Sequence, residues 1–229
     1  MKHAGKATRA GLRLIYLSLV WVLGLVFAGI LARLLGGFLV GAVGILMGVW
    51  FLFGLFTIYF FRDPRPRPPA TVGVLLAPAH GKVDAIDEID EPSFLGGRCR
   101  RISTFLSVFD VHVQYAPVAG RVVLCRHTRG QFVNALRADS ARFNENVLVG
   151  IQSDEREGER IGVRLIAGLI ARRIIPWTAE GEIVARGERI SLIQFGSRVD
   201  LYLPLDYEVT VREGDRVRGG ETVMARRAR

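Results

Sequence analysis

Cysteine and histidine are scarce in this chain of 229 residues. The two cysteines, Cys99 and Cys125, lack CxxC spacing and are too few for a disulfide scaffold. The four histidines are scattered along the sequence, so they form no metal-binding motif. Half of the residues are apolar, which is too many for a disordered chain. These features exclude a disulfide-rich secreted domain, a zinc site and intrinsic disorder.

Acidic residues are absent from the first 61 positions, which hold five of the 31 basic residues. The remaining 26 basic and 22 acidic residues nearly balance, so most of the net charge of +9 lies at the N-terminus. This basic excess adjoins apolar sequence, and the rest of the chain shows no interleaving of aromatic and basic residues. The pattern favours localisation at a membrane and argues against a nucleic-acid partner.

Two apolar runs follow the basic N-terminus, residues 14–32 and 34–61, which are 19 and 28 residues long. A membrane-spanning helix needs about 20 apolar residues, so residues 1–61 predict an anchor with two passes that turns near Arg33, Gly36 and Gly37. A secretory signal would have one shorter apolar run followed by a cleavage site, and this pattern is absent. The alternative is a buried helical hairpin in a soluble core.

Basic residues flank both ends of this anchor, which places both flanks on the cytoplasmic side of the cell membrane by the positive-inside rule. The second pass also carries glycines at short intervals, a spacing that suits close helix packing. It fits either the hairpin itself or a dimer contact. These glycines are Gly37, Gly41, Gly44 and Gly48.

Residues 62–70 form a proline-rich stretch that predicts an extended linker. From residue 71 to 229 short apolar runs alternate with glycine and charged turns, which predicts a mainly β domain. The stretch Leu165–Ile175 is compatible with a short helix or a buried strand. Strands are expected at Val72–Leu76, Ile102–Leu106, Val111–Tyr115, Arg121–Leu124, Asn146–Ile151, Val163–Ile166, Ile190–Phe195 and Val199–Leu203.

A weak internal repeat, V-x-x-G-acid-R-aliphatic, begins at Val184 and again at Val211. Its glycine suits a tight turn, and its acid suits a hydrogen bond to the turn backbone. Such paired turns resemble the half-hammerheads of biotinyl/lipoyl-type barrel-sandwich domains. No lysine lies between the repeats, which excludes a lipoyl or biotin arm.

Between the repeats, Gly196 and Ser197 join two expected strands. Glycine lets a nucleophile approach its carbonyl closely, and the serine hydroxyl one residue later is placed for an N→O acyl shift. The resulting ester can undergo β-elimination, and hydrolysis of the dehydroalanine leaves a pyruvoyl group. Taken alone, the same dipeptide is an ordinary turn.

Several segments, in order over residues 58–210, together resemble phosphatidylserine decarboxylase in its short, archaeal-like branch. They are Phe60-Phe-Arg-Asp-Pro64, Ala77-Pro-Ala-His-Gly-Lys-Val83, Phe109-Asp-Val-His-Val113 with Ala116-Pro117, Ile166-Ala-Gly-Leu-Ile-Ala-Arg-Arg173 and Phe195-Gly-Ser-Arg-Val-Asp200. The resemblance implies a proenzyme that cleaves itself into chains 1–196 and 197–229, which remain together as a heterodimer, with a higher oligomer left open.

The resemblance further implies that Ser197 becomes a covalent pyruvoyl cofactor. Its ketone forms a Schiff base with the serine headgroup of phosphatidylserine, and loss of CO2 yields phosphatidylethanolamine. Two other readings stay open. One is a membrane-tethered, non-catalytic β-module, and the other is a pyruvoyl decarboxylase for another amine.

His112 is the acid/base candidate, because the family pattern surrounds it and imidazole titrates near neutral pH. Long-branch relatives carry a second histidine where this chain has Tyr115. A second departure is His80, which stands where the family pattern has aspartate in Ala-Asp-Gly-Lys-Val. Three alternatives follow: His80 replaces that aspartate as the base, Asp84 takes the role, or self-cleavage is slow or absent.

Overall fold

The computed structural model describes residues 5–33, 37–130, 143–168, 173–194 and 197–228. Gly196, one of the predicted site residues, therefore lies outside the described residues. The described chain divides into two compact units, Gly5–Asp63 and the part that begins at Pro64.

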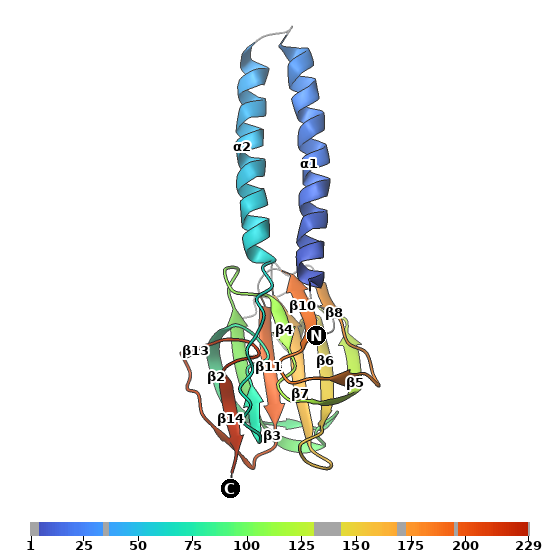
Figure 1. The fold of residues 1–229 in the computed structure, drawn as a ribbon, viewed down its shortest axis with the longest axis vertical. Helices are drawn as coiled ribbons and strands as arrows, with labels where there is room; N and C mark the ends of the chain where they lie inside the picture. The colour runs from blue at the N-terminus through green and yellow to red at the C-terminus, as the bar shows by residue number, and fades with distance from the viewer. Residues whose placement is uncertain (1–4, 34–36, 131–142, 169–172, 195–196, 229) are drawn as a thin grey trace. The chain divides into compact units, whose positions relative to one another are not determined.

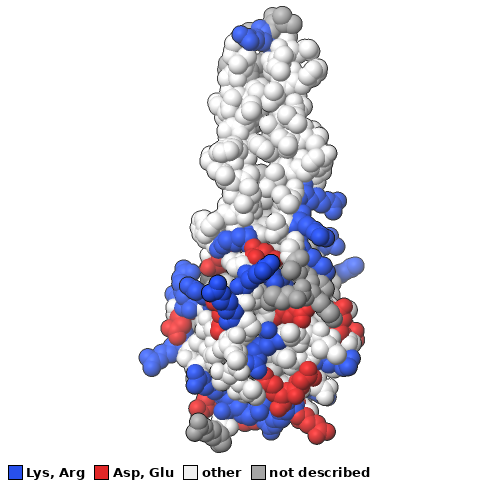
Figure 2. All heavy atoms as spheres, in the orientation of Figure 1, with Lys and Arg blue, Asp and Glu red and all other residues white. Residues whose placement is uncertain are grey.

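The first unit consists of helices α1 (Lys6–Ala32) and α2 (Gly37–Phe60), both long and apolar enough to cross a membrane. Many of their large apolar side chains are exposed, among them Trp21, Phe27 and Phe51. Figure 2 shows no charge along the middle of this unit, with basic side chains toward its ends, whereas charges of both signs cover the β unit. A hairpin buried in a soluble core would hide these side chains, so the structure instead allows membrane association.

The two helices contact each other through small and polar groups. Trp50 Nε1 donates a hydrogen bond of 2.7 Å to Ser18 Oγ, and a Cβ built on Gly29 would lie 2.6 Å from Val43 Cγ2. In contrast, Cβ atoms built on Gly37, Gly41, Gly44 and Gly48 of the second pass would meet nothing within 4 Å. Those glycines therefore do not pack the hairpin in the described part of the chain.

The second unit is mainly β, as predicted. Its largest sheet has eight antiparallel strands in the order β13-β2-β3-β11-β7-β6-β5-β9 and curls around an apolar core (Figure 1). Two three-stranded sheets, β1-β14-β12 and β4-β10-β8, complete it. The bounds are β1 Val74–Leu76, β2 Gly81–Glu91, β3 Gly97–Leu106, β4 Val113–Tyr115, β5 Gly120–Thr128, β6 Asn146–Ser153, β7 Arg160–Ala167, β8 Arg173–Pro176, β9 Ile183–Val184, β10 Arg189–Gln194, β11 Ser197–Leu203, β12 Tyr207–Val209, β13 Arg216–Val217 and β14 Val223–Arg227.

All eight expected strands coincide with strands of the structure, apart from differences at their ends and Phe195, which lies outside the described residues. The ambiguous stretch Leu165–Ile175 is strand at both of its ends, and its residues 169–172 lie outside the described part of the chain. Leu165 to Ala167 end β7, and β8 begins at Arg173. The prediction missed β2, the longest of the described strands, and the short strands β9, β12, β13 and β14.

The repeated turns have the predicted conformation. Gly187 and Gly214 have φ of +72° and +95°, in the left-handed region that favours glycine. The carboxylates of Glu188 and Asp215 each accept a hydrogen bond of 2.8 Å from the backbone amide three residues earlier. The repeat therefore marks two equivalent turns.

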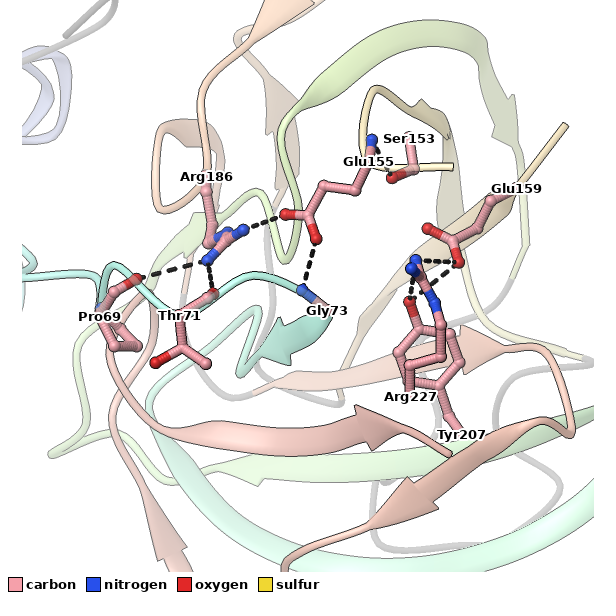
Figure 3. Close-up of polar contacts among 9 residues, drawn as sticks. All are labelled: Pro69, Thr71, Gly73, Ser153, Glu155, Glu159, Arg186, Tyr207 and Arg227. Atoms are coloured by element: carbon pink, nitrogen blue, oxygen red, sulfur yellow. Dashed lines mark hydrogen bonds and ion pairs between the residues drawn. The ribbon is translucent and has the colours of Figure 1, made fainter. Parts of the chain in front are cut away.

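From Pro64 onward, the predicted linker is extended but held on the β unit by hydrogen bonds. The guanidinium of Arg186 donates to the carbonyls of Pro69 and Thr71 and pairs with Glu155 (Figure 3). The other oxygen of Glu155 accepts the amide of Gly73 at 2.7 Å. This stretch is therefore part of the folded β unit and not a loose tether.

Candidate active site

Ser197 begins β11, a central strand of the large sheet. Its neighbours across the sheet are Leu106 of β3 and Ala167 of β7. Its side chain is fully buried, and among the described residues its Oγ has no hydrogen-bond partner. A buried hydroxyl without a partner costs folding free energy, about 1–3 kcal/mol. Such a group in a native fold calls for an explanation, and a catalytic role is one of the recognised ones.

Successive side chains of a strand point to opposite faces of its sheet. Val199 and Leu201, which share the face of Ser197, belong to the apolar core. Arg198 and Asp200 occupy the other face. Ser197 therefore points toward the inside of the curled sheet, and the two charged residues that follow it point outward.

His112 directly precedes β4 and is buried. Its Nδ1 lies 2.9 Å from the carbonyl oxygen of Asp110, which can only accept, so Nδ1 carries the proton. In neutral His112 the lone pair is then on Nε2, the form that a general base requires. The carbonyl of His112 accepts the amide of Ile193 at 3.1 Å, which ties it to the end of β10 that leads to Ser197.

His80 directly precedes β2, on the far side of β3 from Ser197. Its ring meets the ring of Tyr115 edge to face, with centroids 5.7 Å apart. Tyr115 in turn donates its amide to the carbonyl of Pro78 at 2.8 Å. The two positions at which the sequence departs from the family pattern are therefore in contact, although they are 35 residues apart.

Gly81 holds the backbone beside His80 close to β3. A Cβ at this position would lie 2.2 Å from the carbonyl oxygen of Phe105. We expect Gly81→Ala to lower the free energy of unfolding by about 1–3 kcal/mol, since the strands must separate to admit the methyl group. Thermal unfolding measures the change, and Gly97→Ala is the control because a Cβ there meets nothing within 4 Å. Equal melting temperatures of the two variants would contradict this close approach.

Asp84 lies at an irregularity in β2, where the register with β3 shifts between Val83 and Ala85. Its Oδ2 is 3.3 Å from Nη1 of Arg198. Burial raises the pKa of the Asp84 carboxyl above its usual value, against the opposing effect of the Arg198 charge. Asp84 therefore lies beside Arg198, the residue after Ser197, on the sheet face opposite to the serine side chain.

Three charged residues near this site, Arg198, Asp200 and Arg101, had no role assigned to them in the sequence analysis. Asp200 is fully buried, and its Oδ1 accepts a hydrogen bond of 3.1 Å from Nε of Arg198. Arg101 on β3 approaches the other oxygen of Asp200 at 3.9 Å. The spacing of Arg198 and Asp200 on one strand was visible in the sequence, but their partners on β2 and β3 were not.

Comparison with known proteins decides the family. The phosphatidylserine decarboxylase family model matches residues 53–225. The chain belongs to the phosphatidylserine decarboxylase family. It is 43% identical over 180 residues to the phosphatidylserine decarboxylase proenzyme of Desulfotalea psychrophila, covering 79% of this chain and 83% of that protein.

Other family members agree. The chain is 45% identical over 172 residues to the proenzyme of the same name from Symbiobacterium thermophilum, covering 75% and 79% of the two chains. It is 41% identical over 170 residues to that of Rhodopirellula baltica, covering 73% and 70%. Ser197, His112, His80 and Asp84 all lie within the segment that the family model matches.

Proposed function

We propose that this member of the family converts phosphatidylserine to phosphatidylethanolamine, using a pyruvoyl group made from Ser197. The observation that carries the proposal is the buried hydroxyl of Ser197. It has no hydrogen-bond partner among the described residues and begins a central strand directly after Gly196. The relatives' names add that they are proenzymes that act on this lipid.

The proposed self-cleavage begins with Oγ of Ser197 attacking the carbonyl carbon of Gly196. The C–N bond breaks, an ester forms, and the nitrogen of residue 197 becomes an amine. A base then removes the Cα proton and the Cβ–Oγ bond breaks, which releases the carboxylate of Gly196 and leaves dehydroalanine. Water hydrolyses this to the pyruvoyl group and ammonia. The products are chains 1–196 and 197–229, paired as a heterodimer.

His112 is the proposed acid/base group, because its Nε2 has the lone pair in the tautomer that Asp110 selects. His80 takes the place of the family's aspartate, and its contact with Tyr115 holds its ring. Asp84, the other candidate, is paired with Arg198 instead, so we assign it no proton transfer. The pyruvoyl group, once formed, supplies an electron sink for the charge left by loss of CO2.

The substrate is a membrane lipid, and the anchor keeps the domain at the bilayer. We place it on the cytoplasmic face of the cell membrane, because basic residues flank both apolar helices. A reporter fused after Ala10 should appear in the cytoplasm, and its appearance outside would overturn this topology.

Intact mass spectrometry of the purified protein tests the proposal. We expect a chain ending at Gly196 and a second chain, 197–229, lighter by one ammonia than the unmodified peptide. The protein should also release CO2 from phosphatidylserine vesicles. A single uncleaved chain would favour the non-catalytic β-module. Cleavage with CO2 release from another amine, and none from phosphatidylserine, would favour a pyruvoyl decarboxylase for that amine.

A further inference from the structure

Five charged side chains of alternating sign form a row across β2, β3 and β11, on the sheet face opposite to the side chain of Ser197. In order they are Asp84, Arg198, Asp200, Arg101 and Asp87, and we call them the Arg198 ladder. Arg198 contacts Asp84 at 3.3 Å and Asp200 at 3.1 Å. Arg101 lies 3.9 Å from Asp200 and donates a hydrogen bond of 2.8 Å to Asp87.

The centre of this ladder is buried. The side chains of Arg198 and Asp200 are 3% and 0% exposed, whereas Asp87 at the end is 42% exposed. Removing charges from water costs free energy that their attraction often fails to recover. Stability alone is therefore a weak reason for such an arrangement directly beside one peptide bond.

The ladder also crosses the proposed cleavage point. Arg198 and Asp200 would belong to the small chain, and the other three members to the large chain. Cleavage would turn Ser197 into a chain end, and a chain end gains conformational freedom unless side chains fix it. Arg198 is the first side chain after that end, and it is held from both chains.

We propose that Arg198, held by Asp84 and Asp200, is a positioning residue that fixes Ser197 during self-cleavage and keeps the ester shielded until elimination is complete. This rests on the proposed function. A displaced ester would instead meet water, which adds to the carbonyl of Gly196 and breaks the acyl C–Oγ bond. That reaction leaves the carboxylate of Gly196 and an ordinary serine N-terminus at residue 197. The two products of the small chain differ by one ammonia.

The variant Asp84→Asn removes one charge from the ladder without changing its shape. Misplacement by about 1 Å can slow a reaction 100-fold, so we expect self-cleavage to be roughly 10- to 100-fold slower. A larger share of the small chain should carry serine. The matched control is Glu88→Gln, which removes a carboxylate from the same strand. Among the described residues, Glu88 forms ion pairs with the exposed Arg98 and with Arg100, both on β3.

The melting temperature separates positioning from stability. A raised pKa in the folded state means that ionised Asp84 costs folding free energy at neutral pH, a cost that disappears as pH falls through that pKa. Asp84→Asn should therefore melt no lower than wild type at neutral pH. Asp84→Glu, which restores the charge, should recover most of the cleavage rate and of the pyruvoyl product.

The experiment follows full-length protein made by cell-free synthesis into lipid nanodiscs, with intact mass recorded over time. Asp84→Asn that matches Glu88→Gln in rate and product would overturn the inference. If Asp84→Asn does not fold, Asp87→Asn replaces it in the experiment. A modest rise in the share of small chain that carries an N-terminal serine would support the role of the ladder. An unchanged share would refute it. Wild-type protein that stays uncleaved would instead refute the proposed function, and the inference with it.

Discussion

Ser197→Ala is expected to remain a single chain of 229 residues and to release no CO2 from phosphatidylserine. Alanine has no hydroxyl to attack Gly196, so neither the ester nor the pyruvoyl group can form. The fold should persist, because the substitution removes a buried hydroxyl that has no partner among the described residues. Intact mass and a CO2-release assay measure both effects.

The control for this variant is Ser103→Ala. Ser103 lies on the adjacent strand β3, is also fully buried, and its hydroxyl likewise has no partner among the described residues. It should cleave and decarboxylate as wild type does. Cleavage of Ser197→Ala at the same bond would show that another group is the nucleophile.

His112→Asn is expected to slow the appearance of the two chains by about 10²- to 10⁴-fold, the usual contribution of a positioned acid/base group. The asparagine amide can still donate to the carbonyl of Asp110, which accepts Nδ1 of His112 at 2.9 Å. The variant thus keeps this hydrogen bond and removes the proton-accepting nitrogen. The time course of cleavage by intact mass gives the rate, and thermal unfolding shows whether the fold is kept.

The matched control is His127→Asn on β5, where the histidine side chain is 49% exposed and lies 3.1 Å from Glu145. This variant should cleave at the wild-type rate. If His112→Asn cleaves as fast as His127→Asn, then His112 has a structural role. His80 would then be the remaining candidate for the base.

The fold was largely predictable because apolar runs and repeated turns depend on local sequence. β2 was missed because most of its residues after Val83 are acidic, and such a sequence is typical of a solvent-exposed loop. In the structure three of these acids lie opposite arginines of β3: Asp87 opposite Arg101, Glu88 opposite Arg100 and Asp90 opposite Arg98. Cross-strand pairs of this kind stabilise a strand without giving it an apolar pattern.

The site was predictable only in part. Ser197 and His112 stand in motifs that a sequence displays. The pairing of Asp84 with Arg198 depends on the register shift in β2 and on β3 lying between β2 and β11. Such contacts arise from long-range strand order, which no local pattern encodes. The same holds for the meeting of His80 and Tyr115.

The position of β11 between β3 and β7 would determine how long the proposed cleaved form stays assembled. A small chain that supplies an inner strand, and also β14 beside β1, cannot leave without opening the sheet on both sides. Once it has left, its return becomes a bimolecular reaction that depends on dilution, whereas the uncut precursor refolds at a high effective concentration. The mature form is therefore expected to owe its persistence to a slow rate of unfolding and not to a reversible equilibrium.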